Sequence, residues 1–178
     1  GNGKTSGAEM ISTPEFYEHF VRSFVETIHA KREGVFEVDL QLRPYGSAGS
    51  LAVMLRAFET YFVPDGPAWD YERQALLRLR PIVGDAELGN HLLNLRDEYL
   101  HTGLSFDIAS MRAMRERQRR HLVTAGTFNA KFSAGGVVDV EYLVQALQIN
   151  HGHSDESVRH ANMREAMQAL RAAGVLAD

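Results

Sequence analysis

The chain of 178 residues contains no cysteine. It therefore has no disulfide framework and no thiolate chemistry, which is consistent with a reducing compartment. It also contains no apolar run of about 18 residues, the length that a membrane-spanning helix requires, and no secretory signal pattern. We therefore expect a cytoplasmic protein that has no membrane partner.

The chain also lacks an excess of positive charge. Its formal net charge is −4 and its pI is about 6.1. These values argue against a general nucleic-acid binder, although a local basic site is compatible with them. Hydrophobic residues make up 44% and charged residues 24%, as in ordinary soluble globular proteins. The length suits one core or two small subdomains.

The most informative segment predicts a strand over residues 35–43. Apolar and polar residues alternate there, which is the period of a strand with one buried face. Pro44 removes a backbone donor and ends the strand, and a Gly/Ser loop follows at 46–50. A carboxylate, Asp39, and a guanidinium, Arg43, on one rigid element beside such a loop suit metal-bound phosphate. A solvated face of an antiparallel edge strand is the alternative.

A second segment combines a short predicted strand at 128–132 with two glycines and a helix that begins at 137. Lys131 stands just before the turn formed by Gly135 and Gly136. A strand, a double glycine and a helix start together bring backbone donors close to a phosphate. The same pattern can also mean only a tight connection.

Helical periodicity dominates the rest of the chain. Predicted helices cover 13–31, 51–62, 68–80, 85–99, 107–123, 137–150 and 158–173. The predicted caps are Ser12 or Thr13 for the first helix and Ser105 or Asp107 for the fifth. Predicted buried residues include Phe16, Phe20, Phe24 and Ile28 in the first helix and Trp69, Leu76 and Leu79 in the third.

The fifth predicted helix is strongly basic, with five arginines and a single glutamate over 112–120. Arg112, Arg115 and Arg119 are spaced i, i+3 and i+7, so they should share one face. A solvated face is the simplest interpretation of this pattern. An anionic partner or a triphosphate would be the functional one.

Three blocks of the sequence, in order, carry a family resemblance: VDLQLRPYGSAGSL, AWDYERQALLRLRPIVGD and KFSAGGVVDVEYLVQ. They resemble the catalytic module of glutamine synthetase adenylyltransferases, bacterial enzymes of the polymerase-β-like nucleotidyltransferase superfamily. The resemblance extends from about Gly3 to at least Gln148. It implies transfer of AMP from ATP to a tyrosine of glutamine synthetase, or phosphorolytic removal of that AMP. Mg²⁺ and ATP are then the implied cofactors, and the PII signal protein is a second candidate partner beside glutamine synthetase.

The resemblance also implies roles for individual residues. Asp39 would be a catalytic metal ligand, and Arg43 would steady a phosphate or orient Asp39. Weaker candidates for contact with the nucleotide are Lys131, Gly135, Gly136, Arg73 and Arg80.

One departure from the family concerns the catalytic carboxylates. Members carry Gly-Ser followed by an Asp-x-Asp pair upstream of the position of Asp39, and these 178 residues contain no such arrangement. Asp139 and Glu141 have the right spacing, but they fall at a helix start, where i and i+2 point to different faces. We therefore expect a fragment that holds one of three metal carboxylates and is inactive by itself.

The expected fold class is α+β and mostly helical, with a partial nucleotidyltransferase palm followed by a helical domain. The expected division is 1–104 for the nucleotidyltransferase-like part and 105–178 for the helical domain. Asp139 and the block around Trp69 resemble the adenylylating half of these enzymes more than the removing half. Two alternatives stay open: a related nucleotidyltransferase such as a PII uridylyltransferase, and a non-catalytic regulatory or docking module.

Overall fold

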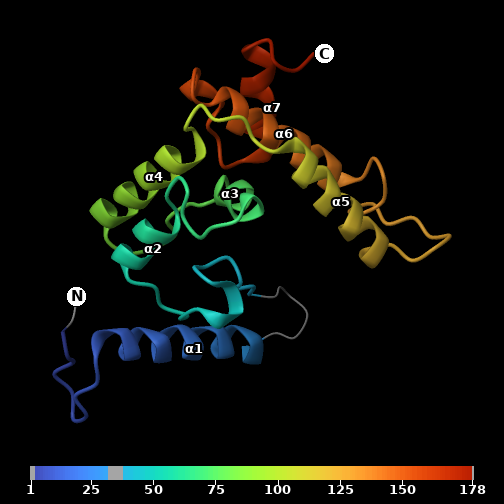
Figure 1. Cartoon of the computed structure of the whole chain (residues 1–178). Helices are drawn as coiled ribbons and strands as arrows, with labels where there is room; N and C mark the ends of the chain where they lie inside the picture. Colours follow the sequence, from blue (N-terminus) through green and yellow to red (C-terminus); the bar gives the residue numbers. More distant parts are fainter. Residues whose placement is uncertain (1–2, 32–37, 178) are drawn as a thin grey trace. The chain divides into compact units, whose positions relative to one another are not determined.

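The computed structural model describes residues 3–31 and 38–177 and is mostly helical, as predicted (Figure 1). The chain divides into two compact units, Gly1–Ala68 and Trp69–Asp178. The first contains α1 (Thr13–Lys31), the short 3-10 helix η1 (Gly46–Ala48) and α2 (Leu55–Tyr61). The second contains α3 (Asp70–Leu76), α4 (Ala86–Leu100), α5 (Ile108–Leu122), α6 (Val137–His151), η2 (Glu156–Val158) and α7 (Met163–Ala172). The expected boundary at 104/105 stays a prediction.

Helix α1 begins where the sequence predicts. The Ser12 hydroxyl accepts the backbone N–H of Glu15 at 3.3 Å, which satisfies one donor of the first turn. However, the aromatic side chains expected on its buried face, Phe16, Phe20 and Phe24, are exposed. The periodicity correctly indicates an apolar face, but burial also requires another element packed against that face.

A small aromatic cluster lies at the end of α2 in the first unit. Tyr61 and Phe62, at the end of α2, are almost fully buried. The Tyr61 ring lies 4.9 Å from both the Tyr45 and the Phe62 ring centroids, and Phe58 lies 4.7 Å from Phe62. These tilted and edge-to-face pairs are the favoured geometries of aromatic contacts. The helix is shorter than the predicted 51–62, because it begins only at Leu55.

The strand predicted over 35–43 does not form in its described part. Residues 35–37 lie outside the described residues, and residues 38–43 are irregular. The Asp39 carboxylate accepts the Gln41 N–H at 2.8 Å, and the Arg43 N–H donates to the Gln41 carbonyl at 2.9 Å. A strand needs a neighbour for its backbone groups. The described residues contain no strand, only an isolated bridge between Lys4 and Ser12.

Helix α6 is the centre of the second unit and packs against α3, α5 and α7. The best-buried apolar cluster joins α6 to η2 and α7. Its members are Val144, Val158, Ala166 and Leu170, with Leu147, Met163, Val175 and Leu176 packed around them. The polar residue Gln148 is also buried here, and its Nε2 donates to the Val158 and His160 carbonyls at 2.7 and 2.8 Å. This side chain therefore fixes the loop that precedes α7.

The predicted starts of α4, α5 and α6 are confirmed. Asp85 accepts the Leu88 N–H at 2.8 Å, and Asp107 accepts the Ser110 N–H at 3.0 Å. Both are side-chain caps of the kind the sequence indicates. Helix α7 begins at 163 rather than at the predicted 158, because Asn162 caps it. In the described part of the chain, no helix combines the length and the apolar character needed to cross a membrane.

A buried histidine, His101, follows α4 and is only 6% exposed. Gly152 packs directly against its ring, and the imidazole Nδ1 has no hydrogen-bond partner among the described residues. Burial, followed by the charge of Arg159, lowers the pKa of His101 from 6.5 to about 4. The folded protein therefore holds this imidazole neutral at neutral pH.

We expect the stability of the protein to fall as the pH drops from about 6.5 to about 4. In this window the unfolded chain binds a proton at His101 and the folded chain does not, so protonation favours unfolding. The loss should reach about 3 kcal/mol, since one pKa unit corresponds to about 1.4 kcal/mol. Urea denaturation at several pH values measures it. His101→Gln should remove this part of the pH dependence, whereas His121→Gln, at an exposed position on α5, should retain it.

Candidate functional site

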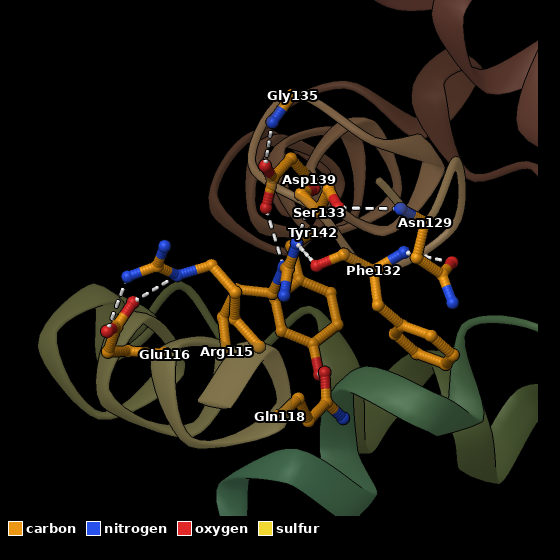
Figure 2. A network of polar contacts seen from close by, with 10 residues as sticks. Arg115, Glu116, Gln118, Asn129, Phe132, Ser133, Gly135, Asp139 and Tyr142 are labelled. Carbon is orange, nitrogen blue, oxygen red and sulfur yellow. Dashed lines mark hydrogen bonds and ion pairs between the residues drawn. The ribbon is translucent and has the colours of Figure 1, made fainter. Parts of the chain in front are cut away.

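The segment that precedes α6 is a turn rather than the predicted strand at 128–132 (Figure 2). The Asn129 side-chain oxygen accepts the backbone N–H groups of Lys131 and Phe132 at 3.0 and 3.1 Å. The Ser133 hydroxyl accepts the Asn129 N–H at 2.8 Å. These side chains supply the backbone bonds that a neighbouring strand would otherwise supply. Alternation of apolar and polar residues was therefore misleading here.

The two glycines stand where the turn enters α6. Gly135 has a φ of 75°, a conformation that glycine adopts without steric cost, and its N–H donates to Asp139 Oδ2 at 2.6 Å. Gly136 caps α6, and its N–H donates to the Ser133 carbonyl at 2.9 Å. Both amides that were predicted to contact phosphate thus already have acceptors within the protein. A phosphate at Gly135 would have to displace the Asp139 carboxylate.

Gly136 is also the tightest position of the turn. A Cβ there would lie 2.7–2.9 Å from the carbonyl oxygens of Ala130, Lys131 and Ser133. Because all three obstacles are backbone atoms, a methyl group can be accommodated only by moving the turn. We expect Gly136→Ala to destabilise the protein by about 1–3 kcal/mol. Urea denaturation measures this, and Gly126→Ala is a matched control because a Cβ at Gly126 meets no atom within 4 Å.

The control variant Gly126→Ala also introduces backbone strain, because Gly126 has a φ of 76°. Alanine at such a φ is itself strained by roughly 1 kcal/mol. The prediction therefore requires Gly136→Ala to cost more than Gly126→Ala. Equal losses would mean that the turn shifts freely and that the contacts with the three carbonyls do not constrain it.

Arg115 connects α5 to this turn (Figure 2). Its Nε donates to Asp139 Oδ1 at 2.6 Å, and its Nη2 donates to the carbonyls of Phe132 and Ser133 at 2.8 and 3.1 Å. Arg115 is 9% exposed, and its Nη1 has no partner among the described residues. The carboxylate of Asp139 therefore binds a guanidinium with one oxygen and the Gly135 amide with the other.

The basic helix does not present the face that the spacing of its arginines predicts. Arg115 is buried and ion-paired, so it cannot join Arg112 and Arg119 in an exposed anion-binding face. Arg119 and Arg120 both bind Glu116, at 2.8 and 3.0 Å. Their hydrogen bonds lower the pKa of this partly exposed carboxyl to about 2.

The structure brings three of the predicted phosphate-binding residues together on one turn: Lys131, Gly135 and Gly136. Lys131 is exposed, and its ammonium lies 5.0 Å from the centroid of the Phe132 ring. A cation above an aromatic face at this distance is a weak attraction that leaves the ammonium open to water. Of the three residues, Lys131 is therefore the one whose polar group can bind a ligand without breaking a hydrogen bond of a backbone amide.

Asp39 and Arg43 lie in the first unit, on the loop that replaces the predicted strand. The Arg43 guanidinium donates to the carbonyls of Gly49, at 3.1 Å, and Leu40. It thereby links the segment at Leu40 to the end of the Gly/Ser loop. Asp39 is exposed, and one of its oxygens accepts the Gln41 N–H. The described residues contain no cluster of three or more His, Asp or Glu side chains placed to hold a metal.

The two arginines of the third predicted helix differ in their surroundings. Arg73 is buried, and its Nη2 donates to the Leu100 carbonyl at 2.7 Å and the Thr102 hydroxyl at 3.2 Å. Burial lowers the pKa of this guanidinium, although it stays charged at neutral pH. Arg73 thus joins α3 to the end of α4. Arg80 is exposed beyond the end of α3.

Sequence reasoning missed the buried polar residues that organise the second unit. Arg115 was one of five similar arginines, and no periodicity distinguished it. Gln74 and Gln145 lie in predicted helices and were not among the predicted buried residues, yet both are buried, and Gln74 Nε2 donates to Gln145 Oε1 at 2.6 Å. A polar residue in an otherwise apolar stripe, such as Gln148 one turn after Val144, was the available signal.

Comparison with known proteins identifies similar sequences. A family model described as glutamate-ammonia ligase adenylyltransferase matches residues 1–95. Curated relatives named bifunctional glutamine synthetase adenylyltransferase/adenylyl-removing enzyme match nearly the whole chain. The relative from Methylococcus capsulatus is 35% identical over 97% of this chain and 19% of its own length. Those from Pseudomonas aeruginosa and Bordetella pertussis are 31% and 33% identical, over 98% and 99% of this chain. The chain spans about a fifth of the length of these relatives.

Proposed function

The chain belongs to the glutamate-ammonia ligase adenylyltransferase family, and on this premise we propose that it forms part of a nucleotidyltransferase module acting on glutamine synthetase. The reaction would be transfer of AMP from ATP to a tyrosine of glutamine synthetase, or removal of that AMP. The observation that carries the proposal is 31–35% identity to enzymes with these two named activities over nearly the whole chain. The match therefore includes the turn at Gly135 and Gly136 (the Gly-Gly turn) as well as the segment around Asp39.

Asp39 is the proposed metal ligand. It presents an exposed carboxylate on a loop that Arg43 holds in place. Mg²⁺ is usually bound in proteins through one or two carboxylates together with substrate phosphates, so this single donor fits the ion. When bound, Mg²⁺ supplies positive charge to the triphosphate and its leaving group. In this arrangement Arg43 positions Asp39 and the Gly/Ser loop through its bonds to backbone carbonyls.

The nucleotidyltransferase palm also belongs to this proposal. Residues 38–43 have the alternation of a strand but adopt an irregular conformation here, where the described residues offer no partner strand. We propose that these residues pair with neighbouring strands in a complete palm. That pairing would fix Asp39 on a rigid element, which a two-metal site requires of its carboxylates.

The Gly-Gly turn is the proposed phosphate contact in the second unit. Lys131 is the strongest candidate, because its ammonium is exposed while the amides of Gly135 and Gly136 are already bonded. Arg80 is also exposed and is a weaker candidate for phosphate contact. Arg73 would contribute by holding α3 in place. We also propose that the protein is cytoplasmic and that the PII signal protein is its second partner.

The proposal is tested by incubating the protein with Mg²⁺, ATP labelled at the α-phosphate, and glutamine synthetase. An enzyme of the relatives' full length that carries this sequence should transfer label to a glutamine synthetase tyrosine from ATP and not from UTP. The 178-residue chain alone should transfer none, because it holds one of the carboxylates that two metal ions require. Preference for UTP with PII as acceptor would instead indicate a uridylyltransferase.

Two further outcomes distinguish the remaining alternatives. If the complete enzyme binds glutamine synthetase but neither adds nor removes AMP, the chain belongs to a docking module. Adenylylated glutamine synthetase incubated with phosphate tests the reverse direction. We propose the adenylylating direction, because Asp139 and the Trp69 block resemble that half of the bifunctional enzymes, and release of AMP without any transfer would contradict it.

A further inference from the structure

A pocket of about 170 Å³ lies within the second unit, between the start of α3 and one face of α5. Its lining residues come from α3 and the residue before it, from the loop before α5, and from α5 itself. They are Trp69, Asp70, Tyr71, Gln74, Phe106, Ser110, Met111, Met114 and Arg117. None of them belongs to the turn or to the loop that the proposed function uses.

The walls of this pocket suit a flat ring. Trp69 was predicted to lie in the core, but it is 67% exposed, and Tyr71 beside it is 48% exposed. Their ring centroids are 6.1 Å apart and the planes are tilted by 48°, so neither ring covers the other's face. Met111 and Met114 add thioethers, which pack favourably against aromatic rings and adapt to their shape.

One of the lining residues, Gln74, is polar. Gln74 is only 3% exposed, and its Nε2 is used in the bond to Gln145 Oε1 at 2.6 Å. Its own Oε1 is buried and has no hydrogen-bond partner among the described residues. Buried carboxamide oxygens are rarely left unpaired, because the lost bond to water is not replaced. A ligand that donates an N–H to this oxygen would replace it.

We propose that this pocket binds a planar nitrogen heterocycle that donates an N–H to Gln74 and packs its faces against Trp69, Tyr71 and the two methionines. The size fits, since an apolar cavity of about 150 Å³ in another protein accommodates benzene. Asp70 and Arg117 contribute one charge of each sign to the lining, which favours a neutral ring over a strongly charged ligand. The inference is independent of the proposed function.

Trp69 makes the proposal directly measurable, because it is the single tryptophan of the chain. Benzimidazole is the probe, and N-methylbenzimidazole is its matched control, with the same ring but no N–H donor. Titration of the unmodified protein with benzimidazole should change Trp69 fluorescence saturably. The methylated compound should bind about tenfold more weakly or worse, as expected for the loss of one buried hydrogen bond.

Two variants locate the site. Gln74→Met keeps a side chain of similar length without the acceptor, so it should abolish the preference for benzimidazole over its methylated form. Tyr71→Ala, at an exposed wall position, should weaken both compounds several-fold. Arg112→Gln is the control, because Arg112 is exposed on α5 but does not line the pocket.

The comparison of the two probes on the unmodified protein decides the proposal even if a variant at the buried Gln74 fails to fold. Absence of a saturable fluorescence change would overturn it. Equal affinity for the two compounds would also overturn it, since binding would then not involve the Gln74 oxygen.

Discussion

Replacing Arg115 with methionine is expected to lower the free energy of unfolding by about 3–4 kcal/mol. The change removes the ion-pair partner of the Asp139 carboxylate and the side-chain donor to the carbonyls of Phe132 and Ser133, of which Ser133 still accepts the Gly136 N–H. Breaking a buried ion pair by removing one partner typically costs about 3–5 kcal/mol. Because Asp139 is partly exposed, we place the effect in the lower part of that range.

Urea denaturation at neutral pH measures this effect, and the chain offers a matched control on the same helix. Arg120→Met removes an exposed arginine whose ion pair with Glu116 is on the surface, and should cost less than about 1 kcal/mol. A double variant, Arg115→Met with Asp139→Leu, should be less destabilised than Arg115→Met alone, because it leaves no unpaired carboxylate. Equal losses for Arg115→Met and Arg120→Met would show that the Arg115 network contributes little.

Replacing Asp39 with asparagine is expected to reduce AMP transfer about 100-fold to 1,000-fold in an enzyme of full length that carries this sequence. Loss of a metal-binding carboxylate removes several kcal/mol of transition-state stabilisation, and each 1.4 kcal/mol corresponds to about a factor of ten. Folding should be nearly unchanged. Asp39 is exposed, and the asparagine side-chain oxygen can still accept the Gln41 N–H.

The measurement is the initial rate of label transfer from ATP to glutamine synthetase at saturating Mg²⁺. Asp65→Asn is the control, because Asp65 is another exposed aspartate of the first unit and its φ of 62° is one that asparagine also tolerates. Unchanged transfer with Asp39→Asn would remove Asp39 from the metal site. A fall in rate accompanied by loss of helical signal would show that the residue acts on folding instead.

The starts of α4, α5 and α6 were predictable because they are decided locally. Asp85 and Asp107 bind amides three residues further along the chain, and Gly136 begins α6 where the sequence changes from a turn to an apolar stripe. Such signals need no knowledge of the rest of the fold. The burial of the α1 phenylalanines depends instead on another element packing against them, and it was predicted wrongly.

The two predicted strands were wrong for a related reason. Alternation describes a strand that already has neighbours, and it cannot show that the neighbours exist. In the described part of 35–43 the side chain of Asp39 satisfies a backbone donor, and in 128–132 that of Asn129 satisfies two. Asn and Asp compete with sheet pairing in this way, and their presence was the signal against a strand.

Most of the candidate site around the Gly-Gly turn could be predicted, but its internal connections could not. Lys131, Gly135 and Gly136 lie together as the sequence indicates. The position of Arg115 depends on how α5 packs against α6, which is a contact between segments 24 residues apart. Helical spacing places Arg112, Arg115 and Arg119 on one face, but only the packing shows which of them points inward.

The Arg115 network has a consequence for the motions of the second unit. Every hydrogen bond that the described residues show for the Arg115 guanidinium is to the turn or to Asp139, so α5 cannot separate from α6 without also releasing the turn. Hydrogen exchange at the Gly135 amide, which Asp139 protects, should therefore occur through the same opening event as exchange in the middle of α5, around Arg115. Helix and turn would thus behave as one cooperative unit, and a ligand that draws Asp139 away from Gly135 would loosen both together.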